Sequence, residues 1–254
     1  MTALAGKHAL VTGGGSGIGA AIAGAFAEAG ANVTIIGRRR EPLDAVAAGA
    51  PRIAGIVADV TDEAALASAF RQAAEARGPV SIVVANAGMA ASAPFARTSL
   101  EDFQRIVLAN LTGTFLTLRE GLKAMHGSGW GRLVAVASVA GLKGYPYVAP
   151  YSAAKHGVVG LVRALAMEVA GSGITVNAVC PGYTESPMLE EAVSTIVAKT
   201  NRSEDEARKT LLRQNPLNRF IKPEEVAAAA LWLCGPQSDA VTGQAISISG
   251  GETW

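Results

Sequence analysis

Short apolar runs alternate with longer amphipathic stretches along the whole chain. Several of the short runs are continuously apolar, which is typical of strands buried on both faces of a parallel sheet. Strands are predicted at 8–11, 33–36, 53–57, 81–85, 132–137, 175–179 and 245–249. Because strand and helix patterns alternate throughout, we expect an α/β chain that forms one domain over residues 1–254. That domain would hold a doubly wound, seven-stranded parallel sheet with right-handed crossovers and helices on both faces.

Apolar residues at helical spacing predict the helices between these strands. Helices are expected over 18–29, 61–78 and 224–233. Thr98 and Glu101 have the spacing of a capping box, so a further helix is expected to begin there.

One segment, 183–215, breaks this alternation, because it is charged and helical in pattern but contains no strand. Two interpretations stay open. The segment is either a pair of solvated surface helices or a lid that covers a binding site.

Composition removes several functional classes. Of the 254 residues, 50% are hydrophobic and 17% are charged, and the net charge is +1, which excludes a disordered chain and disfavours nucleic acid as a partner. Two cysteines are too few for a disulfide scaffold. The N-terminus lacks the pattern of a signal peptide and no apolar stretch is long enough to span a bilayer, so we expect a cytoplasmic protein with no membrane partner. The 29 glycines are an excess that needs an explanation.

Glycines gather between the first predicted strand and the first predicted helix, where Thr12–Gly19 reads Thr-Gly-Gly-Gly-Ser-Gly-Ile-Gly. Glycine lets the backbone approach a ligand closely, and the N-terminus of the helix offers free N–H groups and a positive dipole end. We therefore predict a site for the phosphates of a dinucleotide, against the alternative of a plain tight turn. Its candidate residues are Gly13, Gly15, Ser16, Gly17, Ile18 and Gly19.

The residues at the end of the second predicted strand help to distinguish a site for NAD(H) from a site for NADP(H). An acidic residue there would hold the adenosine ribose and repel a 2′-phosphate. This chain instead has Arg38, Arg39 and Arg40, and guanidinium groups bind phosphate well. The sequence therefore favours NADP(H) as the cofactor, and NAD(H) stays possible. The alternative is that these arginines form only a solvated basic loop. Further cofactor contacts are expected from Asp59, Val60, Asn86, Ala87 and Gly88.

Four polar side chains form a candidate catalytic group. Tyr151 and Lys155 are four residues apart and share a face of a predicted helix, although an isolated pair of this kind is usually an ordinary surface pair. Ser138 ends the fifth predicted strand, at the carboxyl edge where such sheets bind ligands. Asn110 is a polar amide in an otherwise apolar helical stretch.

With these motifs the chain resembles the short-chain dehydrogenase/reductase family, over its whole length. The matching residues are Thr12–Gly19, Asn86-Ala87-Gly88, Asn110, Ser138, Tyr151, Lys155 and Cys180-Pro181-Gly182. Two motifs depart from the family, since Ala85 stands in place of an asparagine and Ser249 in place of an aspartate. The resemblance implies a Rossmann fold, a nicotinamide cofactor, no metal and a homotetramer.

The resemblance also implies a role for each catalytic candidate. Tyr151 would be the general acid or base, with its pKa lowered by the ammonium group of Lys155 and by the positive nicotinamide. Lys155 would also hold the nicotinamide ribose, Ser138 would hydrogen-bond the substrate oxygen, and Asn110 would hold a water of a proton relay. The segment 183–215 would correspond to the substrate lid. Cofactor contacts are further implied for Tyr151, Lys155, Pro181, Gly182 and Thr184.

Within this family the chain is similar to β-ketoacyl and polyketide ketoreductases and to 3-hydroxybutyrate dehydrogenases. The latter grip a free carboxylate at positions that correspond to Ala90, Ala140 and Val148, none of which binds a carboxylate. We therefore favour as substrate a ketone or secondary alcohol with an apolar or aromatic body, or a β-ketoacyl thioester. A 3-hydroxybutyrate-type hydroxy-acid dehydrogenase and a catalytically silent NADP(H)-binding sensor or scaffold are the alternatives. The candidate substrate residues are Met89, Ala140, Leu142, Tyr145, Val148, Tyr183 and Met188.

Overall fold

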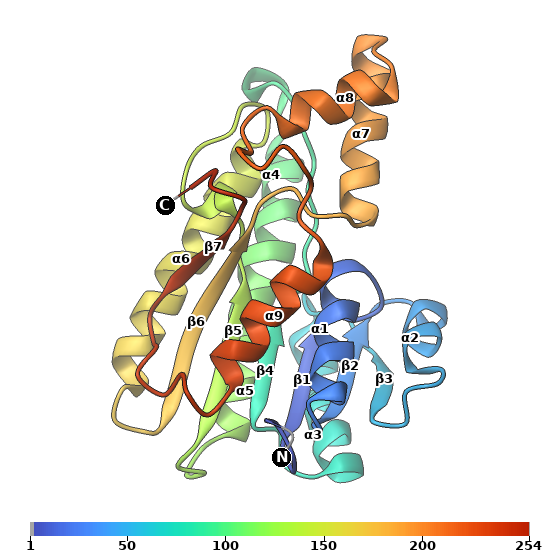
Figure 1. The fold of residues 1–254 in the computed structure, drawn as a ribbon. Coiled ribbons are helices and arrows are strands. Elements are labelled where there is room, and N and C mark those ends of the chain that lie inside the picture. The colour runs from blue at the N-terminus through green and yellow to red at the C-terminus, as the bar shows by residue number, and fades with distance from the viewer. Residues whose placement is uncertain (1–2, 254) are drawn as a thin grey trace.

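The structure is a computed structural model that describes residues 3–253. Its seven strands form one parallel sheet in the order β3-β2-β1-β4-β5-β6-β7 (Figure 1). The strand order therefore runs outward in both directions from the neighbours β1 and β4, which confirms the predicted doubly wound sheet. The strands are β1 (His8–Thr12), β2 (Asn32–Gly37), β3 (Ile53–Val57), β4 (Ile82–Ala85), β5 (Gly131–Val136), β6 (Ile174–Pro181) and β7 (Ala245–Ile248).

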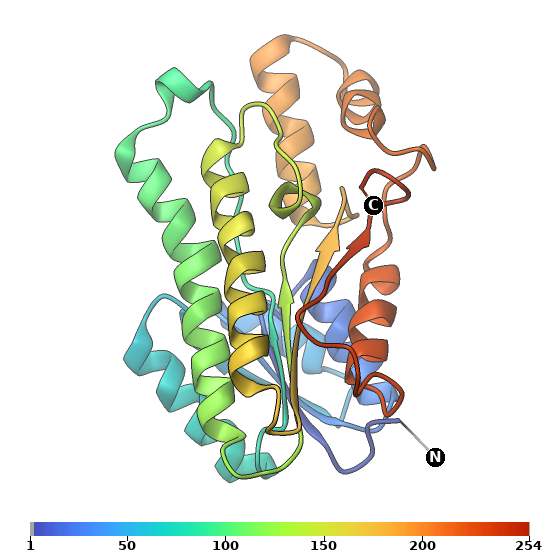
Figure 2. The ribbon, with the colours of Figure 1, turned by 90° about the vertical axis from the view of Figure 1, so that its left-hand side faces the viewer.

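Helices cover both faces of the sheet (Figure 2). One face carries α1, α2 and α9, and the other carries α3, α5 and α6. The helix α2 is not among the predicted helices, because its eight residues bury only Leu43. None of the helices within residues 3–253 is long and apolar enough to cross a membrane. The helices are α1 (Gly17–Glu28), α2 (Arg40–Ala47), α3 (Glu63–Arg77), α4 (Leu100–Val107), α5 (Gly113–Ala124), α6 (Ala149–Val169), α7 (Pro187–Thr200), α8 (Glu204–Leu212) and α9 (Pro223–Cys234).

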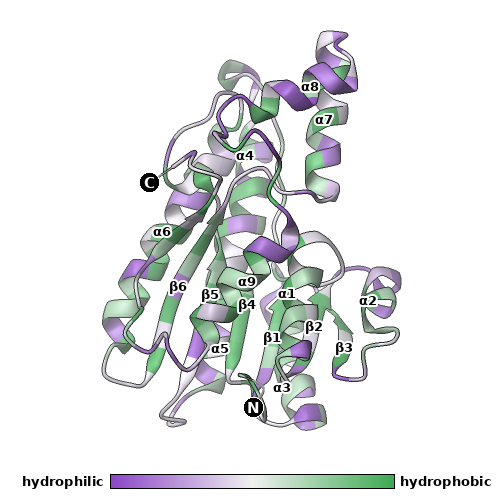
Figure 3. Cartoon of the chain, viewed as in Figure 1, coloured by the Kyte–Doolittle hydropathy of each residue, from purple (hydrophilic) through white to green (hydrophobic). Residues whose placement is uncertain are grey.

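Alternate residues of one strand face the two helical layers, which explains why the strands are apolar throughout. Leu10 and Val83 belong to the core under α3, α5 and α6, whereas Val11 and Val84 belong to the core under α1, α2 and α9. The central strands are accordingly the most hydrophobic part of the cartoon in Figure 3. Burial of one such side chain is worth about 1.5–3 kcal/mol. Hydrophobic burial on both faces thus holds the middle of the sheet together.

The start of α4 lies one residue beyond the predicted capping box. Ser99, and not Thr98, is the N-cap residue, and its hydroxyl oxygen accepts the Asp102 N–H at 3.0 Å. The Thr98 hydroxyl instead donates to the Pro94 carbonyl, in the preceding 3₁₀ turn. The pair Ser99 and Asp102 has the same spacing as Thr98 and Glu101, so the pattern alone does not separate the two registers.

The charged segment 183–215 contains α7 and α8, which lie above the carboxyl edge of the sheet (Figure 1). Leu189, Val193 and Ala207 form a small apolar cluster there, separate from the two main cores. At the base of the segment, Thr184 pairs with Ile221 in a single β-bridge. This helical content agrees with both interpretations of the segment, a surface helix pair and a lid.

Candidate active site

Three of the four predicted catalytic side chains meet at the carboxyl edge of the sheet. Ser138 follows β5, while Tyr151 and Lys155 lie one helical turn apart near the start of α6. The Lys155 Nζ atom lies 5.6 Å from the centre of the Tyr151 ring and donates to the Val136 carbonyl at 2.8 Å. The Ser138 hydroxyl lies close enough to the Tyr151 hydroxyl to act on its pKa. The hydroxyl, phenol and ammonium groups of these three side chains therefore lie close together at the carboxyl edge of the sheet.

The position of Ser138 depends on close packing of the short turn Val139–Gly141 against α6. A Cβ atom on Gly141 would lie 2.6 Å from the Lys155 carbonyl oxygen, so a larger residue does not fit. The Ser138 Oγ atom accepts the Ala140 N–H at 3.1 Å. This contact fixes the oxygen and leaves the hydroxyl hydrogen for another partner.

Asn110 lies fully buried in a π-helical turn between α4 and α5. Its Nδ2 atom donates to the Met89 carbonyl at 2.8 Å, and its Oδ1 atom accepts the Met89 N–H at 3.3 Å. A Cβ atom on Gly88 would lie 2.6 Å from Oδ1 of Asn110 and 3.8 Å from Nζ of Lys155. The Asn110 side chain therefore holds the loop after β4 beside Lys155. Its part in a water relay stays a prediction.

Burial dominates the electrostatics of the catalytic group. It raises the pKa of Tyr151 to about 12, and the neighbouring Ser138 hydroxyl opposes this rise. Burial also lowers the pKa of Lys155 to about 8. The expected lowering of the Tyr151 pKa is therefore wrong for the protein chain by itself, because desolvation of the phenolate outweighs the favourable contacts. Tyr151 carries its proton at neutral pH.

The glycine-rich turn joins β1 to α1 at the same edge of the sheet. A Cβ atom on Gly19 would collide with the Gly13 carbonyl oxygen, and one on Gly13 would lie 2.8 Å from Nδ2 of Asn86. The φ angles of Gly13 and Gly17 are 65° and 50°, a region that favours glycine. Ser16 is the N-cap residue of α1, but its side chain accepts no capping hydrogen bond. The first N–H groups of α1 therefore remain available to a phosphate.

The loop after β4 ties the glycine-rich turn to the catalytic group. The Asn86 Nδ2 atom donates to the carbonyls of Thr12 and Gly13 at 2.9 and 3.2 Å. The N–H groups of Asn86 and Ala87 donate to the Thr12 hydroxyl at 3.0 and 3.2 Å. The sequence predicts cofactor contacts for this loop, but the structure uses these donors to hold the turn. Of the three loop residues, only Gly88 is exposed.

The basic residues after β2 lie near Asp59. Arg38, Arg39 and Arg40 are all exposed, and Arg40 also begins α2 and donates to the backbone of β3 at 3.2 Å. Partial burial would raise the pKa of Asp59, but hydrogen bonds from Thr61 and the charge of Arg38 hold this pKa below its ordinary value. The charge of Arg38 therefore acts on Asp59 at the carboxyl ends of β2 and β3. Val60, the next predicted residue, is buried.

The loop after β6 packs on the glycine-rich turn. Pro181 and Thr184 are buried, and the Thr184 hydroxyl donates to the Gly182 carbonyl at 3.0 Å. A Cβ atom on Gly17 would lie 3.1 Å from the Cβ atom of Ser186, just before α7. The base of the segment 183–215 therefore touches the turn that would hold the phosphates.

The predicted substrate residues do not all face one apolar wall. Leu142 packs against a main core, the Met89 sulfur accepts from Arg105 on α4 at 3.6 Å, and Met188 is 39% exposed. Ala140 is buried beside Ser138, and Val148 is the N-cap residue of α6.

Tyr145 and Tyr183 do lie together, with ring centres 6.5 Å apart and planes at 83°. The Tyr145 hydroxyl donates to Glu252, which also pairs with Lys143 at 3.2 Å. Sequence reasoning missed Glu252 and Lys143, because no local pattern around either residue marks a buried ion pair. This side of the site is therefore partly charged and not the apolar wall that the sequence predicts.

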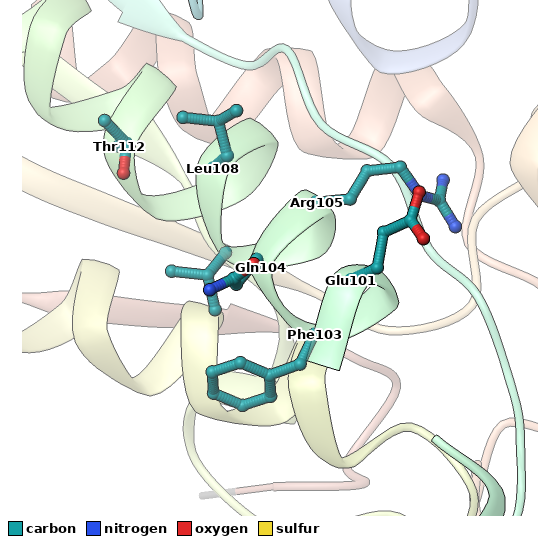
Figure 4. A pocket seen from close by; sticks show the side chains of 7 residues that line it. Glu101, Phe103, Gln104, Arg105, Leu108 and Thr112 are labelled. Atoms are coloured by element: carbon teal, nitrogen blue, oxygen red, sulfur yellow. The ribbon is translucent and has the colours of Figure 1, made fainter. Parts of the chain in front are cut away.

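A shallow hollow of about 470 Å³ lies on the outer side of α4 (Figure 4). It contains no predicted site residue, so it does not mark the active site. No group of His, Cys, Asp or Glu within residues 3–253 has an arrangement that could hold a metal ion. The lining residues of the hollow are Glu101, Phe103, Gln104, Arg105, Val107, Leu108 and Thr112.

Comparisons with known proteins agree with the resemblance drawn from the motifs. The family model described as short chain dehydrogenase matches residues 7–196. The chain is 35% identical to a D-beta-hydroxybutyrate dehydrogenase of Rhizobium meliloti (strain 1021), over 97% of this chain and 98% of that protein. It is 39% identical to the granaticin polyketide synthase putative ketoacyl reductase 1 of Streptomyces violaceoruber, over 96% and 92% of the two chains. A solved structure of a single-residue variant of the actinorhodin polyketide ketoreductase with NADPH has a TM-score of 0.93, with 37% identity and 97% of each chain covered.

The packing at Gly19 predicts a loss of stability in a Gly19→Ala variant. The new Cβ atom would press on the Gly13 carbonyl, and overpacking of this kind costs about 1–3 kcal/mol. Gly24→Ala is the matched control in the same helix, since nothing lies within 4 Å of its new Cβ atom. We expect a lower free energy of unfolding in urea for Gly19→Ala and an unchanged or higher one for Gly24→Ala. Equal stability of the two variants would contradict the described packing.

Proposed function

This chain belongs to the short-chain dehydrogenase family, and we propose that it reduces a ketone to a secondary alcohol with NADPH as the reductant. Family and relatives make it an oxidoreductase of the carbonyl reductase and dehydrogenase kind. The observation that carries the proposal is the meeting of Ser138, Tyr151 and Lys155 beside a glycine-rich turn. When bound, NADPH supplies the hydride for the carbonyl carbon.

Tyr151 and Ser138 act on the substrate oxygen in this proposal. With its pKa raised to about 12 by burial, Tyr151 holds a proton at neutral pH and donates it to the ketone oxygen. The Ser138 hydroxyl donates a hydrogen bond to the same oxygen and stabilises the negative charge that develops there. Below its pKa of about 8, Lys155 is an ammonium ion, which stabilises the phenolate that Tyr151 leaves. Alcohol oxidation needs the phenolate at the outset, so a rise in pH favours that direction.

Several residues fit a dinucleotide phosphate. The N-terminus of α1 has no side-chain cap, and the first turn of this helix admits no Cβ atom at Gly19. We assign Arg38 to the 2′-phosphate, because it is exposed at the end of β2 and its charge acts on Asp59. The NADPH in the structure of the actinorhodin ketoreductase supports this preference.

The substrate we propose is a ketone without a free carboxylate, either apolar or aromatic in its body or a β-ketoacyl thioester. Ala90, Ala140 and Val148 offer no group that binds a carboxylate. Similarity to a polyketide ketoacyl reductase supports this class. Similarity to a D-beta-hydroxybutyrate dehydrogenase supports the alternative, a small hydroxy acid. A higher rate with free acetoacetate than with acyl thioesters and hydrophobic ketones would favour the alternative.

We also propose that the segment 183–215 is the lid of this site. Its base packs on Gly17, and the Lys199 Nζ atom near the far end of α7 donates to the Ser92 carbonyl at 2.8 Å. The segment thus reaches from the glycine-rich turn to the loop after β4, where it would exclude water from the reacting atoms.

Tyr151→Phe tests the proposed chemistry. Removal of the phenol hydroxyl deletes the proton donor, so we expect kcat for ketone reduction to fall by at least about 100-fold. NADPH binding, measured by fluorescence titration, should change less than twofold. Tyr147→Phe is the control, because Tyr147 is 64% exposed. Turnover of Tyr151→Phe near the unmodified rate, followed at 340 nm, would sink the assignment.

Arg38→Ala tests the choice of cofactor. Loss of a charge-assisted hydrogen bond costs about 1.5–3 kcal/mol, so the Kd for NADPH should rise by roughly ten- to a hundredfold while the Kd for NADH stays the same. Arg40→Ala is the matched control. It removes the same charge two residues away, from a side chain that already donates to the backbone of β3. Equal loss of both cofactors in Arg38→Ala would count against a 2′-phosphate contact.

We propose a homotetramer in which the outer faces of α4 and α5 pack on another subunit. Phe103, Leu108 and Phe115 are 40%, 45% and 41% exposed on these faces, and the first two line the hollow in Figure 4. Gathered apolar side chains of this kind are typical of interfaces. Light scattering should give about four times the chain mass of 25.8 kDa, and a Phe103→Glu/Leu108→Glu variant should give a smaller particle. A single chain mass at micromolar concentration would overturn this assembly.

A further inference from the structure

Glu252 is a buried carboxylate near the C-terminal end of the chain. Its side chain is only 1% exposed. The Tyr145 hydroxyl donates to its Oε1 atom, and the Lys143 Nζ atom lies 3.2 Å from that same oxygen. A buried carboxylate is costly unless it is paired and hydrogen-bonded, and these two groups supply both requirements.

The tail that carries Glu252 is held in place by its own contacts. Gly250 and Gly251 have φ angles of 66° and 89°, and a Cβ atom on Gly250 would collide with Oδ1 of Asn215. Beyond Glu252, the Thr253 hydroxyl lies 2.6 Å from the Ser247 hydroxyl on β7. The carboxylate is therefore directed inward by anchors on both sides of it.

Glu252 lies where three segments around the proposed substrate site meet. Lys143 and Tyr145 belong to the segment between β5 and α6. A Cβ atom on Gly182, just after β6, would lie 3.4 Å from Oε2 of Glu252. The third segment follows α8, where the Gln214 Oε1 atom accepts from Lys143 at 2.9 Å.

Two aromatic rings lie between Glu252 and the proposed catalytic tyrosine. Tyr145, bound to Glu252, packs edge-on against Tyr183. The charge of Glu252 adds to burial in raising the pKa of Tyr183, and Tyr183 in turn acts on the pKa of Tyr151. Glu252, Tyr145 and Tyr183 therefore form one cluster on the segments that follow β7, β5 and β6, and the last two of these strands also lead to Ser138 and to the segment 183–215.

We propose that Glu252 is a specificity-determining residue that excludes ketones with a free carboxylate. It holds Lys143 in an internal ion pair, so that this cation does not bind a substrate anion, and it keeps a negative charge behind Tyr145 and Tyr183. This inference rests on the proposed ketone reduction and assigns the selectivity of that same site to one charge. Ala90, Ala140 and Val148 offer no side chain that attracts a substrate carboxylate. In addition, the negative charge of Glu252 would repel such a carboxylate.

The test compares acetoacetate with its ethyl ester, which share the 3-oxobutanoyl group but differ by one charge and an added ethyl group. The quantity measured is the ratio of kcat/KM for the acid to kcat/KM for the ester, with NADPH at saturation. Glu252→Gln keeps a hydrogen-bond acceptor for Tyr145 and removes the charge. We expect the ratio to rise about tenfold, which corresponds to about 1.4 kcal/mol.

Lys143→Gln should change the ratio of kcat/KM for acid and ester in the opposite direction. It leaves Glu252 without its cation, so the ratio should fall about tenfold, or the acid should cease to react, with the ester largely unaffected. This second variant decides the matter if Glu252→Gln does not fold. Glu63→Gln is the matched control, because it removes an exposed glutamate that pairs with Arg119. Its ratio should equal that of the unmodified protein.

Three results are distinguishable. Opposite shifts in Glu252→Gln and Lys143→Gln support the role of Glu252. An unchanged ratio in a folded Glu252→Gln variant, or an equal loss for acid and ester in both variants, overturns it and leaves ketone reduction standing. Absence of ester reduction by the unmodified protein, together with absence of reduction of other neutral ketones, overturns the proposed function itself.

Discussion

The close approach of two loops, one after β1 and one after β4, is the contact on which the candidate site depends. β1 and β4 are parallel neighbours at the centre of the sheet, so their carboxyl ends deliver the two loops to one place. Asn86 then binds the carbonyls of Thr12 and Gly13, and the space between the loops is too small for a Cβ atom on Gly13. Each such hydrogen bond contributes only about 1 kcal/mol net, but an unpaired buried amide costs more. The same loop continues to Gly88, beside Lys155, so one contact links the phosphate cradle to the catalytic group.

Burial that positions the catalytic residues also sets their protonation. Desolvation raises the pKa of Tyr151 and lowers that of Lys155, because it disfavours the charged form of each. A neutral phenol is a proton donor, which is the protonation state that the proposed ketone reduction requires. The neighbouring Ser138 hydroxyl favours the phenolate and limits the rise of the Tyr151 pKa. The proposed proton transfer would therefore need both burial, which orients the side chains, and enough polarity to let the proton leave.

Sequence reasoning succeeds where the physical cause is local or follows from topology. Short apolar runs, several of them continuously apolar, predict the seven strands of residues 3–253, because a parallel sheet is covered by helices on both faces. The meeting of Ser138 with Tyr151 is predictable because carboxyl ends of parallel strands share an edge. The short helix α2 has too few apolar residues to show a stripe, and the Ser99 cap has a rival register one residue earlier. The contact between Tyr145 and Glu252 spans 107 residues, and no local pattern encodes it.

The tail shows how a departure from a family motif changes the electrostatics of a site. Ser249 stands where the family has an aspartate, and its hydroxyl accepts from the Ser247 hydroxyl at 2.8 Å and from the Thr253 N–H at 3.3 Å. Neutral groups therefore hold this strand end, and Glu252 is the single charged side chain of residues 245–253. Since the anchors of the tail are hydroxyls and glycines, the carboxylate does not carry the fold of the tail. Its buried charge is instead directed at Lys143 and Tyr145, on the side of the sheet where Tyr151 would meet its substrate.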